Sequence, residues 1–125
     1  MKTYLVLIFM LIANPVWADW KLIATTANGD EAYIDMDSLR IDKSLRRVWT
    51  LSNLKKKGSK GELSIRVLRE FDCKQEQDRA LVMTGFTGAM SGGEMLSTYR
   101  GDNDPWDYIA PNTISQAYFS MVCRK

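Results

Sequence analysis

Most of this chain alternates between apolar and polar residues with a period of two, and turn signals interrupt the alternation at short intervals. Successive side chains of a β-strand point to opposite faces, so this alternation predicts strands. We expect strand segments at residues 20–26, 31–36, 45–54, 62–71, 79–90 and 94–100. Because short turns join most of them, the segments should form one six-stranded antiparallel β-sheet.

Two central segments indicate which side chains of the sheet are buried. Residues 45–54 place Trp49 and Leu51 on one face, and residues 62–71 place Val67 and Phe71 on one face. We expect one face of the sheet to be buried and the other to be largely solvated.

The last dozen residues change to a helical period. Apolar residues recur at Ile114, Ala117, Tyr118, Met121 and Val122. The preceding Thr113-Ile-Ser-Gln116 has the form of a capping box, which predicts the start of a helix. We expect one C-terminal α-helix, from about Thr113 to Cys123, packed on the apolar face of the sheet in an α+β fold.

Residues 1–18 have the pattern of a cleavable signal peptide. Lys2 precedes an apolar run at residues 4–13 that is too short to span a bilayer, and Val16-Trp17-Ala18 ends in a small residue. Cleavage after Ala18 would leave a single domain of residues 19–125. Asp19 stands where a lipidated cysteine would have to be, so we expect a soluble periplasmic or secreted protein without a lipid anchor or transmembrane segment.

The chain has two cysteines, Cys73 and Cys123. In an exported protein such a pair is expected to form a disulfide. Cys73 ends the fourth predicted strand and Cys123 ends the helix, so the bond would tie the helix to the sheet. A redox-active pair is the less favoured alternative, because the cysteines do not form a Cys-x-x-Cys motif and have no histidine neighbour.

Charge excludes one class of function and indicates another. The 17 basic and 15 acidic residues nearly balance, which argues against a nucleic-acid-binding protein. Lys55, Lys56, Lys57 and Lys60 nevertheless cluster on a glycine-containing hairpin tip that we expect to be mobile. They form the candidate ligand-binding site, for an acidic glycan or an acidic protein surface. Arg46, Arg47 and Arg66 on neighbouring strands could extend this patch, and a solvated hairpin tip is the alternative interpretation.

Catalytic patterns are weak. The chain contains no histidine, which removes the commonest general base and most zinc sites. Asp35 and Asp37 could share a strand face, but a turn capped by Asp37 is the favoured interpretation. We therefore expect a protein that is not an enzyme and has no catalytic residues, metal or cofactor.

Several short motifs together resemble the surface-adhesin protein E family of Gram-negative bacteria. They are Tyr33-Ile34-Asp35, Ser38-Leu39-Arg40, Val48-Trp49-Thr50-Leu51, Glu70-Phe71-Asp72-Cys73, Pro105-Trp106 and Val122-Cys123, with Trp20 near the mature start. The resemblance implies a six-stranded antiparallel sheet with a C-terminal helix. It also implies an adhesin-like function, since the family's namesake binds host vitronectin, laminin and plasminogen and can dimerise.

Two functions therefore remain. The first is an exported, non-enzymatic binding module that contacts acidic glycans or host or envelope proteins. The alternative is a periplasmic structural or assembly protein that acts by self-association, for instance as a homodimer paired along an exposed sheet edge.

Overall fold

The computed structural model describes residues 18–101 and 103–124, so the predicted signal peptide lies outside the described residues except for Ala18. The strands are β1 (Lys21–Thr25), β2 (Glu31–Asp42), β3 (Leu45–Asn53), β4 (Ser64–Asp72), β5 (Gln77–Phe86), β6 (Met95–Arg100) and β7 (Asp107–Tyr108). A 3-10 turn, η1 (Ala89–Ser91), connects β5 to β6, and the helix is α1 (Ile114–Val122).

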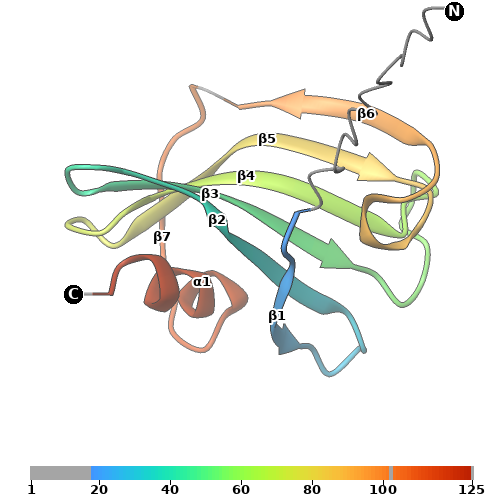
Figure 1. The fold of residues 1–125 in the computed structure, drawn as a ribbon, viewed down its shortest axis with the longest axis horizontal. Coiled ribbons are helices and arrows are strands. Elements are labelled where there is room, and N and C mark those ends of the chain that lie inside the picture. The colour runs from blue at the N-terminus through green and yellow to red at the C-terminus, as the bar shows by residue number, and fades with distance from the viewer. Residues whose placement is uncertain (1–17, 102, 125) are drawn as a thin grey trace, which may run out of the picture.

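The strands form one antiparallel sheet in the order β1-β2-β3-β4-β5-β6 (Figure 1). Each strand pairs with its neighbour in sequence, as short hairpin connections require. The two-residue β7 pairs with the start of β5. The predicted six-stranded sheet is therefore confirmed, with β7 as a short addition.

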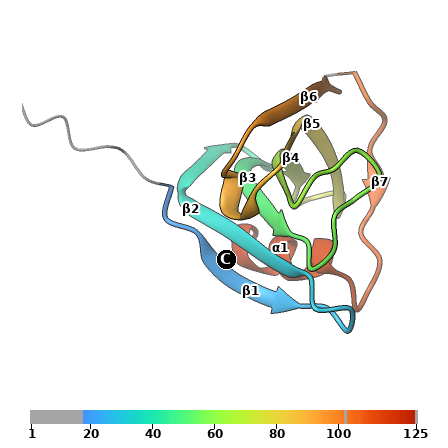
Figure 2. The ribbon, with the colours of Figure 1, turned by 90° about the vertical axis from the view of Figure 1, so that its right-hand side faces the viewer.

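The helix begins where its capping signal predicts. The backbone N–H of Gln116 donates to Oγ1 of Thr113 at 3.2 Å, and the Gln116 side chain accepts from the backbone N–H of Asn112 at 2.7 Å. The first bond satisfies an N–H that has no partner within the first helical turn, and the second holds the residue that precedes the N-cap Thr113. Figure 2, seen from one end of the molecule, shows the sheet curving around α1.

The face of the sheet that α1 covers, here called the helix face, carries an apolar core. Its buried members are Ala32, Ile34, Val48, Phe71, Tyr118 and Val122. Tyr118 is 1% exposed, and its hydroxyl donates to the carbonyl oxygen of Tyr33 at 3.1 Å. Burial raises the pKa of Tyr118 to about 12, because the phenolate would lose its hydration.

The predicted assignment of side chains to faces is wrong for the centre of the sheet. Leu51 pairs with Arg66, and Thr50 pairs with Val67. Since paired residues project to the same face, Trp49 and Leu51 lie on the face opposite to Val67 and Phe71. The pairing register, which alternation within one strand does not determine, decides this relationship.

The opposite face is also not largely solvated. Leu51 is 0% exposed and Phe86 is 5% exposed there. Glu70, 1% exposed, is buried on the same face and forms ion pairs with Arg47 and Arg79, both at 2.7 Å. This face therefore combines apolar side chains with a buried, ion-paired carboxylate.

The predicted disulfide joins Cys73 to Cys123, with the two Cα atoms 5.5 Å apart. Cys73 follows β4 directly, and Cys123 is the C-cap of α1. Arg46 adds a second connection at this point, because its Nε donates to the carbonyl oxygen of Val122 at 3.2 Å. The bond links the helix end to the sheet, as the sequence predicts.

Candidate functional site

The lysine loop, defined as residues 54–63, connects β3 to β4. Its ends are joined by a hydrogen bond from the Leu54 N–H to the Leu63 carbonyl at 2.8 Å. Within the loop, the Gly58 N–H donates to the Glu62 carbonyl at 2.8 Å, and the Gly61 N–H donates to the Gly58 carbonyl at 3.0 Å. The loop that was expected to be a mobile tip is thus held by its own backbone hydrogen bonds.

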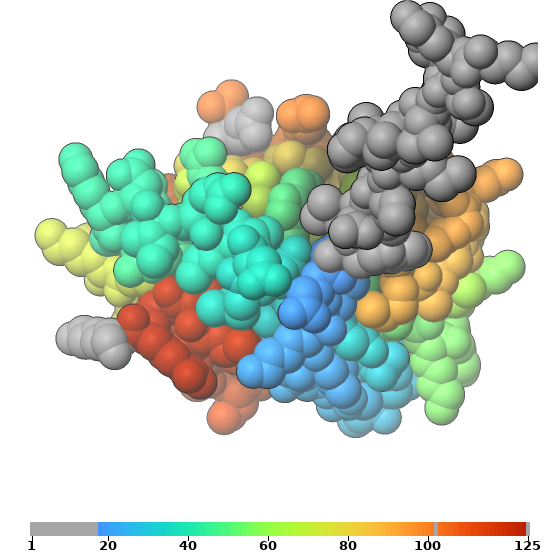
Figure 3. Space-filling view, viewed as in Figure 1, coloured from blue at the N-terminus to red at the C-terminus, as the bar shows by residue number. Residues whose placement is uncertain are grey.

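All four lysines of the predicted site, Lys55, Lys56, Lys57 and Lys60, are exposed. None of them forms an ion pair with any residue in the described part of the chain. The green atoms of this loop project beyond the sheet at one end of the molecule (Figure 3). Their ammonium groups therefore face solvent without a compensating carboxylate.

Two acidic side chains near the lysine loop accept hydrogen bonds from backbone N–H groups. Oδ1 of Asp30 accepts from the Lys55 N–H at 3.0 Å, and Oε2 of Glu62 accepts from the Lys60 N–H at 3.0 Å. The first bond ties the loop to the turn between β1 and β2. A hollow of about 410 Å³ lies between the two and is lined by Asn28, Asp30, Leu54, Lys55 and Lys56.

The three arginines proposed to extend this patch do not belong to it. Arg46 and Arg47 lie at the start of β3, whereas the lysine loop follows its end. Arg46 donates to Val122, and Arg47 pairs with Glu70. Arg66 lies in a separate pocket on the opposite face. The predicted strand of residues 45–54 already separates Arg46 and Arg47 from the loop, because a strand rises about 3.3 Å per residue.

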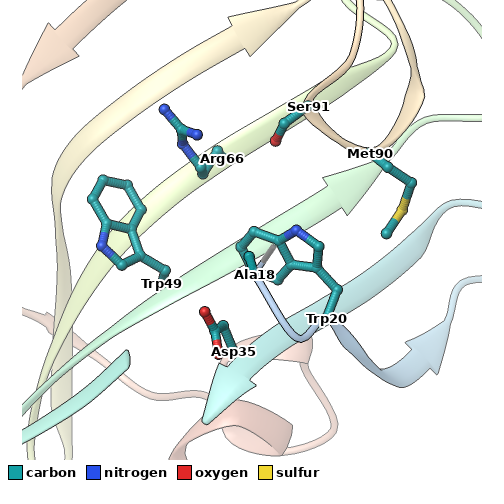
Figure 4. Close-up of a pocket in the computed structure, with 7 residues that line it drawn as sticks. All are labelled: Ala18, Trp20, Asp35, Trp49, Arg66, Met90 and Ser91. Atoms are coloured by element: carbon teal, nitrogen blue, oxygen red, sulfur yellow. The ribbon is translucent and has the colours of Figure 1, made fainter. Parts of the chain in front are cut away.

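That pocket is a cavity of about 490 Å³ on the opposite face of the sheet. Its lining residues are Trp20, Asp35, Trp49, Arg66, Met90 and Ser91, together with Ala18, which the expected cleavage would remove. Figure 4 shows their side chains around the cavity, with Arg66 and Ser91 on one side and Asp35 on the other. Trp49, expected to be a core residue, forms part of the pocket wall.

Arg66 lies close to two aromatic rings in this pocket. Its Cζ is 5.4 Å from the ring centroid of Trp49 and 5.0 Å from that of Phe86. Both distances are within the range of cation–π attraction. Its Nε is buried and has no hydrogen-bond partner among the described residues.

Asp35 differs from its predicted role. It is 9% exposed, and its Oδ1 accepts from the Asp37 N–H at 3.1 Å. The capping carboxylate is therefore Asp35, while Asp37 is exposed. Ser38 completes the turn, because its hydroxyl donates to the Asp35 carbonyl at 2.6 Å and accepts from the Trp49 N–H at 2.9 Å. In the described ranges, no three His, Cys, Asp or Glu side chains gather in a metal-binding arrangement.

The turn η1 forms one rim of the pocket, and sequence reasoning missed it by extending the fifth strand to residue 90. Met90 and Ser91 have positive φ angles of 54° and 62°, a conformation that non-glycine residues seldom adopt. Asn53 holds Met90 by accepting from its N–H at 2.8 Å, and Ser64 accepts from the Ser91 N–H at 3.0 Å. The hydroxyl of Ser91 is buried and has no hydrogen-bond partner in the described part of the chain.

The described residues form an antiparallel sheet with one docked helix, an exposed cationic loop at one end and a pocket on the face opposite to the helix. The model of the surface-adhesin protein E family matches residues 20–124. The chain belongs to this family.

Solved structures of Haemophilus influenzae protein E have the same fold. Its crystal form II has a TM-score of 0.68 at 15% sequence identity, with 86% of this chain and 89% of that chain covered. The selenomethionine form has a TM-score of 0.60 at 14% identity, with 82% and 84% covered. A search of curated proteins gave no significant match. At these identities the likeness establishes the fold alone.

Proposed function

We propose that this protein is an exported, non-enzymatic binding module that uses the lysine loop to bind anionic polysaccharides. Membership of the surface-adhesin protein E family supports an adhesin-like binding role. The observation that carries the proposal is the set of four exposed ammonium groups that form no ion pair with the described residues. A local positive charge on a nearly neutral protein attracts polyanions and directs their approach.

The structure of the loop adds a second argument. Its backbone hydrogen bonds and the bond from Lys55 to Asp30 fix the positions from which the lysine side chains extend. A partner that binds them therefore orders side chains but not backbone, which lowers the entropy cost of binding. The hollow beside Lys55 and Lys56 offers space for one sugar or sulfate group of a polymer.

The test is a charge-neutralised variant in which Lys55, Lys56, Lys57 and Lys60 are replaced by Gln. At low salt, the retention of this variant on immobilised heparin should fall to its retention on an uncharged column. Its free energy of unfolding in urea should stay nearly the same as that of the wild type. Binding of the wild type should weaken as salt rises, because exposed charges are screened beyond ~8 Å at physiological ionic strength.

A matched control carries the same change of charge elsewhere. Replacing Lys21, Lys43, Lys74 and Arg124 by Gln removes four exposed positive charges outside the loop. This control should retain most of the binding. Equal loss in both variants would mean that net charge alone determines retention, and would contradict a site at the lysine loop.

Export to the periplasm or beyond, in a Gram-negative cell, is part of the same proposal. It rests on the signal-peptide pattern of residues 1–18, on Asp19 at the expected mature start and on the family of surface adhesins. The disulfide agrees with an oxidising compartment. Within the described segments, no helix has the length and apolar character needed to cross a bilayer.

Self-association is the second candidate function, and the sheet edges favour it. β1 and β6 lie at the two ends of the strand order, and β6 exposes Met95 at 61% and Tyr99 at 51%. An edge strand with exposed apolar side chains can pair with a second copy. Light scattering at low and high salt distinguishes the two functions, because an edge-paired dimer should persist when salt abolishes heparin binding.

A further inference from the structure

Arg66 differs from the other arginines that contact buried groups in this protein. Arg47 and Arg79 pair with Glu70, and Arg69 pairs with Asp78 at 3.4 Å. Arg66 forms no ion pair or hydrogen bond with the described residues, although its Nε is buried. Withdrawing part of a guanidinium from water without an anionic partner is unfavourable. Among the described residues, Arg66 contacts two aromatic rings and no carboxylate, so its guanidinium can still bind an anion.

A second unpartnered group lies in the same pocket. Three buried side-chain atoms of the described residues have no hydrogen-bond partner: Nε of Arg66, Nε of Arg69 and Oγ of Ser91. Two of these three belong to residues that line the 490 Å³ cavity. Both atoms are closed to solvent, so we interpret the cavity as a site in which a molecule contacts Arg66 at its terminal nitrogens and not at Nε.

The backbone around Ser91 supports this interpretation. Met90 and Ser91 are consecutive residues with positive φ, and side-chain bonds from Asn53 and Ser64 hold them there. Such strained conformations occur where the surrounding structure imposes them, and they concentrate at binding sites. In this case, the conformation places Ser91 on the rim of the cavity beside Met90.

The remaining walls determine the chemistry of the ligand. Trp20 and Trp49 provide flat apolar surfaces, and Asp35 has a carboxylate that can accept hydrogen bonds. A hydroxylated ring can stack its C–H face on an indole and donate hydroxyl protons to Asp35. A carboxylate on that ring can accept from Arg66, which is the geometry that a guanidinium recognises best. The cavity volume lies within the range of ~300–1,000 Å³ that is typical of small-molecule sites.

We propose that this pocket binds a carboxylated sugar ring, with the terminal nitrogens of Arg66 on the carboxylate, Asp35 on ring hydroxyls, and Trp20 and Trp49 against the ring. This site consists of residues outside the lysine loop, and binding there does not depend on that loop. A protein with both sites could hold a polyanion at its loop and one acidic sugar in its pocket.

The indole N–H resonances of the protein purified after export provide a direct test by NMR. Trp20 and Trp49 line the pocket, whereas Trp106 stacks on Arg79 elsewhere and serves as an internal control. Sodium glucuronate or N-acetylneuraminate should shift the first two resonances saturably and leave the third unchanged. Glucose, which lacks the carboxylate, and acetate, which lacks the ring, should each bind at least tenfold more weakly.

Single substitutions test which residues of the pocket contact the sugar acid. Arg66→Gln should weaken binding about tenfold or more, because it removes a charged hydrogen-bond donor. Arg100→Gln, an exposed arginine on β6, is the matched control and should bind as the wild type does. If Arg66→Gln does not fold, Trp20→Ala tests the same pocket from a residue that precedes the sheet.

The outcomes separate this proposal from that of the lysine loop. The four-lysine variant should bind the sugar acid normally, and the Arg66 variant should still bind heparin. Equal responses to acetate and to the sugar acids would overturn the proposal, because the site would then be a simple anion site. So would the lack of a saturable shift with either acid at about 10 mM, a concentration that would fill ~90% of a site with a Kd of ~1 mM.

Discussion

Arg79 and Glu70 form the most buried ion pair of the sheet. Nε and Nη2 of Arg79 both donate to Oε1 of Glu70, at 3.0 and 2.7 Å, and the Glu70 side chain is 1% exposed. Cζ of Arg79 lies 4.3 Å from the ring centroid of Trp106, which covers the pair from the side of the loop before β7. The fixed geometry explains why this face can bury a carboxylate.

Replacing Arg79 by Met should therefore destabilise the protein strongly. Glu70 would lose its buried partner and keep only Arg47, whose side chain is 57% exposed. We expect a loss of about 3 kcal/mol in the free energy of unfolding, measured in urea. Adding Glu70→Gln to Arg79→Met should recover part of this loss. A change below ~1 kcal/mol for the single variant would show that the pair is unimportant for stability.

Removal of the disulfide should detach the end of the helix from the sheet. Cys123→Ser is expected to lower the free energy of unfolding by about 2–5 kcal/mol, because the bond closes a long loop in the unfolded chain. The wild type treated with reductant should match this variant. Two free thiols in protein taken directly from an oxidising compartment would contradict the bond itself.

Tyr118 should make the protein sensitive to alkaline pH. Its pKa is raised to about 12 by burial, against opposing effects of Arg69 and of a hydrogen bond with Thr50. The unfolded chain releases the phenolic proton near pH ~10, so stability is full below that pH and falls as pH rises toward the folded value.

The comparison with Tyr118→Phe isolates this effect. Burial also raises the pKa of Tyr33, and both proteins share that contribution. The stability advantage of the wild type over the variant should shrink by about 2–3 kcal/mol between pH ~10 and ~12. A constant difference across this interval would mean that Tyr118 titrates normally in the folded protein.

Maturation can be checked by mass spectrometry. The intact mass of the exported protein should correspond to residues 19–125 with no added lipid, since Ala18 precedes the expected cleavage point and Asp19 cannot be lipidated as a cysteine is. A diacyl mass, or retention of the first residues in a membrane pellet, would overturn the expectation of a soluble protein.

The elements of this fold could be predicted from local signals. Alternation marked the strands, and Thr113 with Gln116 marked the start of the helix, because both patterns act over a few residues. The two cysteines predicted the bond between the helix end and β4. These features do not require knowledge of how distant segments align.

The candidate sites were predicted less completely. The lysines of the loop are adjacent in sequence, so their cluster was visible, and the position of the loop as a ligand site stays a prediction. The pocket joins Asp35, Trp49 and Arg66 from three strands with Ser91 from a turn. Its existence depends on strand register and on backbone angles at η1, which alternation does not reveal. The same dependence explains why Trp49 was assigned to the wrong face.

The order of the strands has a consequence for folding kinetics. Every strand from β2 to β6 pairs with the strand that precedes it in the chain, so the sheet has low contact order for a β-rich protein and can assemble hairpin by hairpin. α1 is different, because it must return from the C-terminus to contact β1 and β2. A chain that crosses a membrane with its N-terminus first can therefore build its sheet before the helix arrives. Cys73 can form its bond only after Cys123, 50 residues further along the chain, has followed the whole sheet, so oxidation of this pair comes later than pairing of the strands.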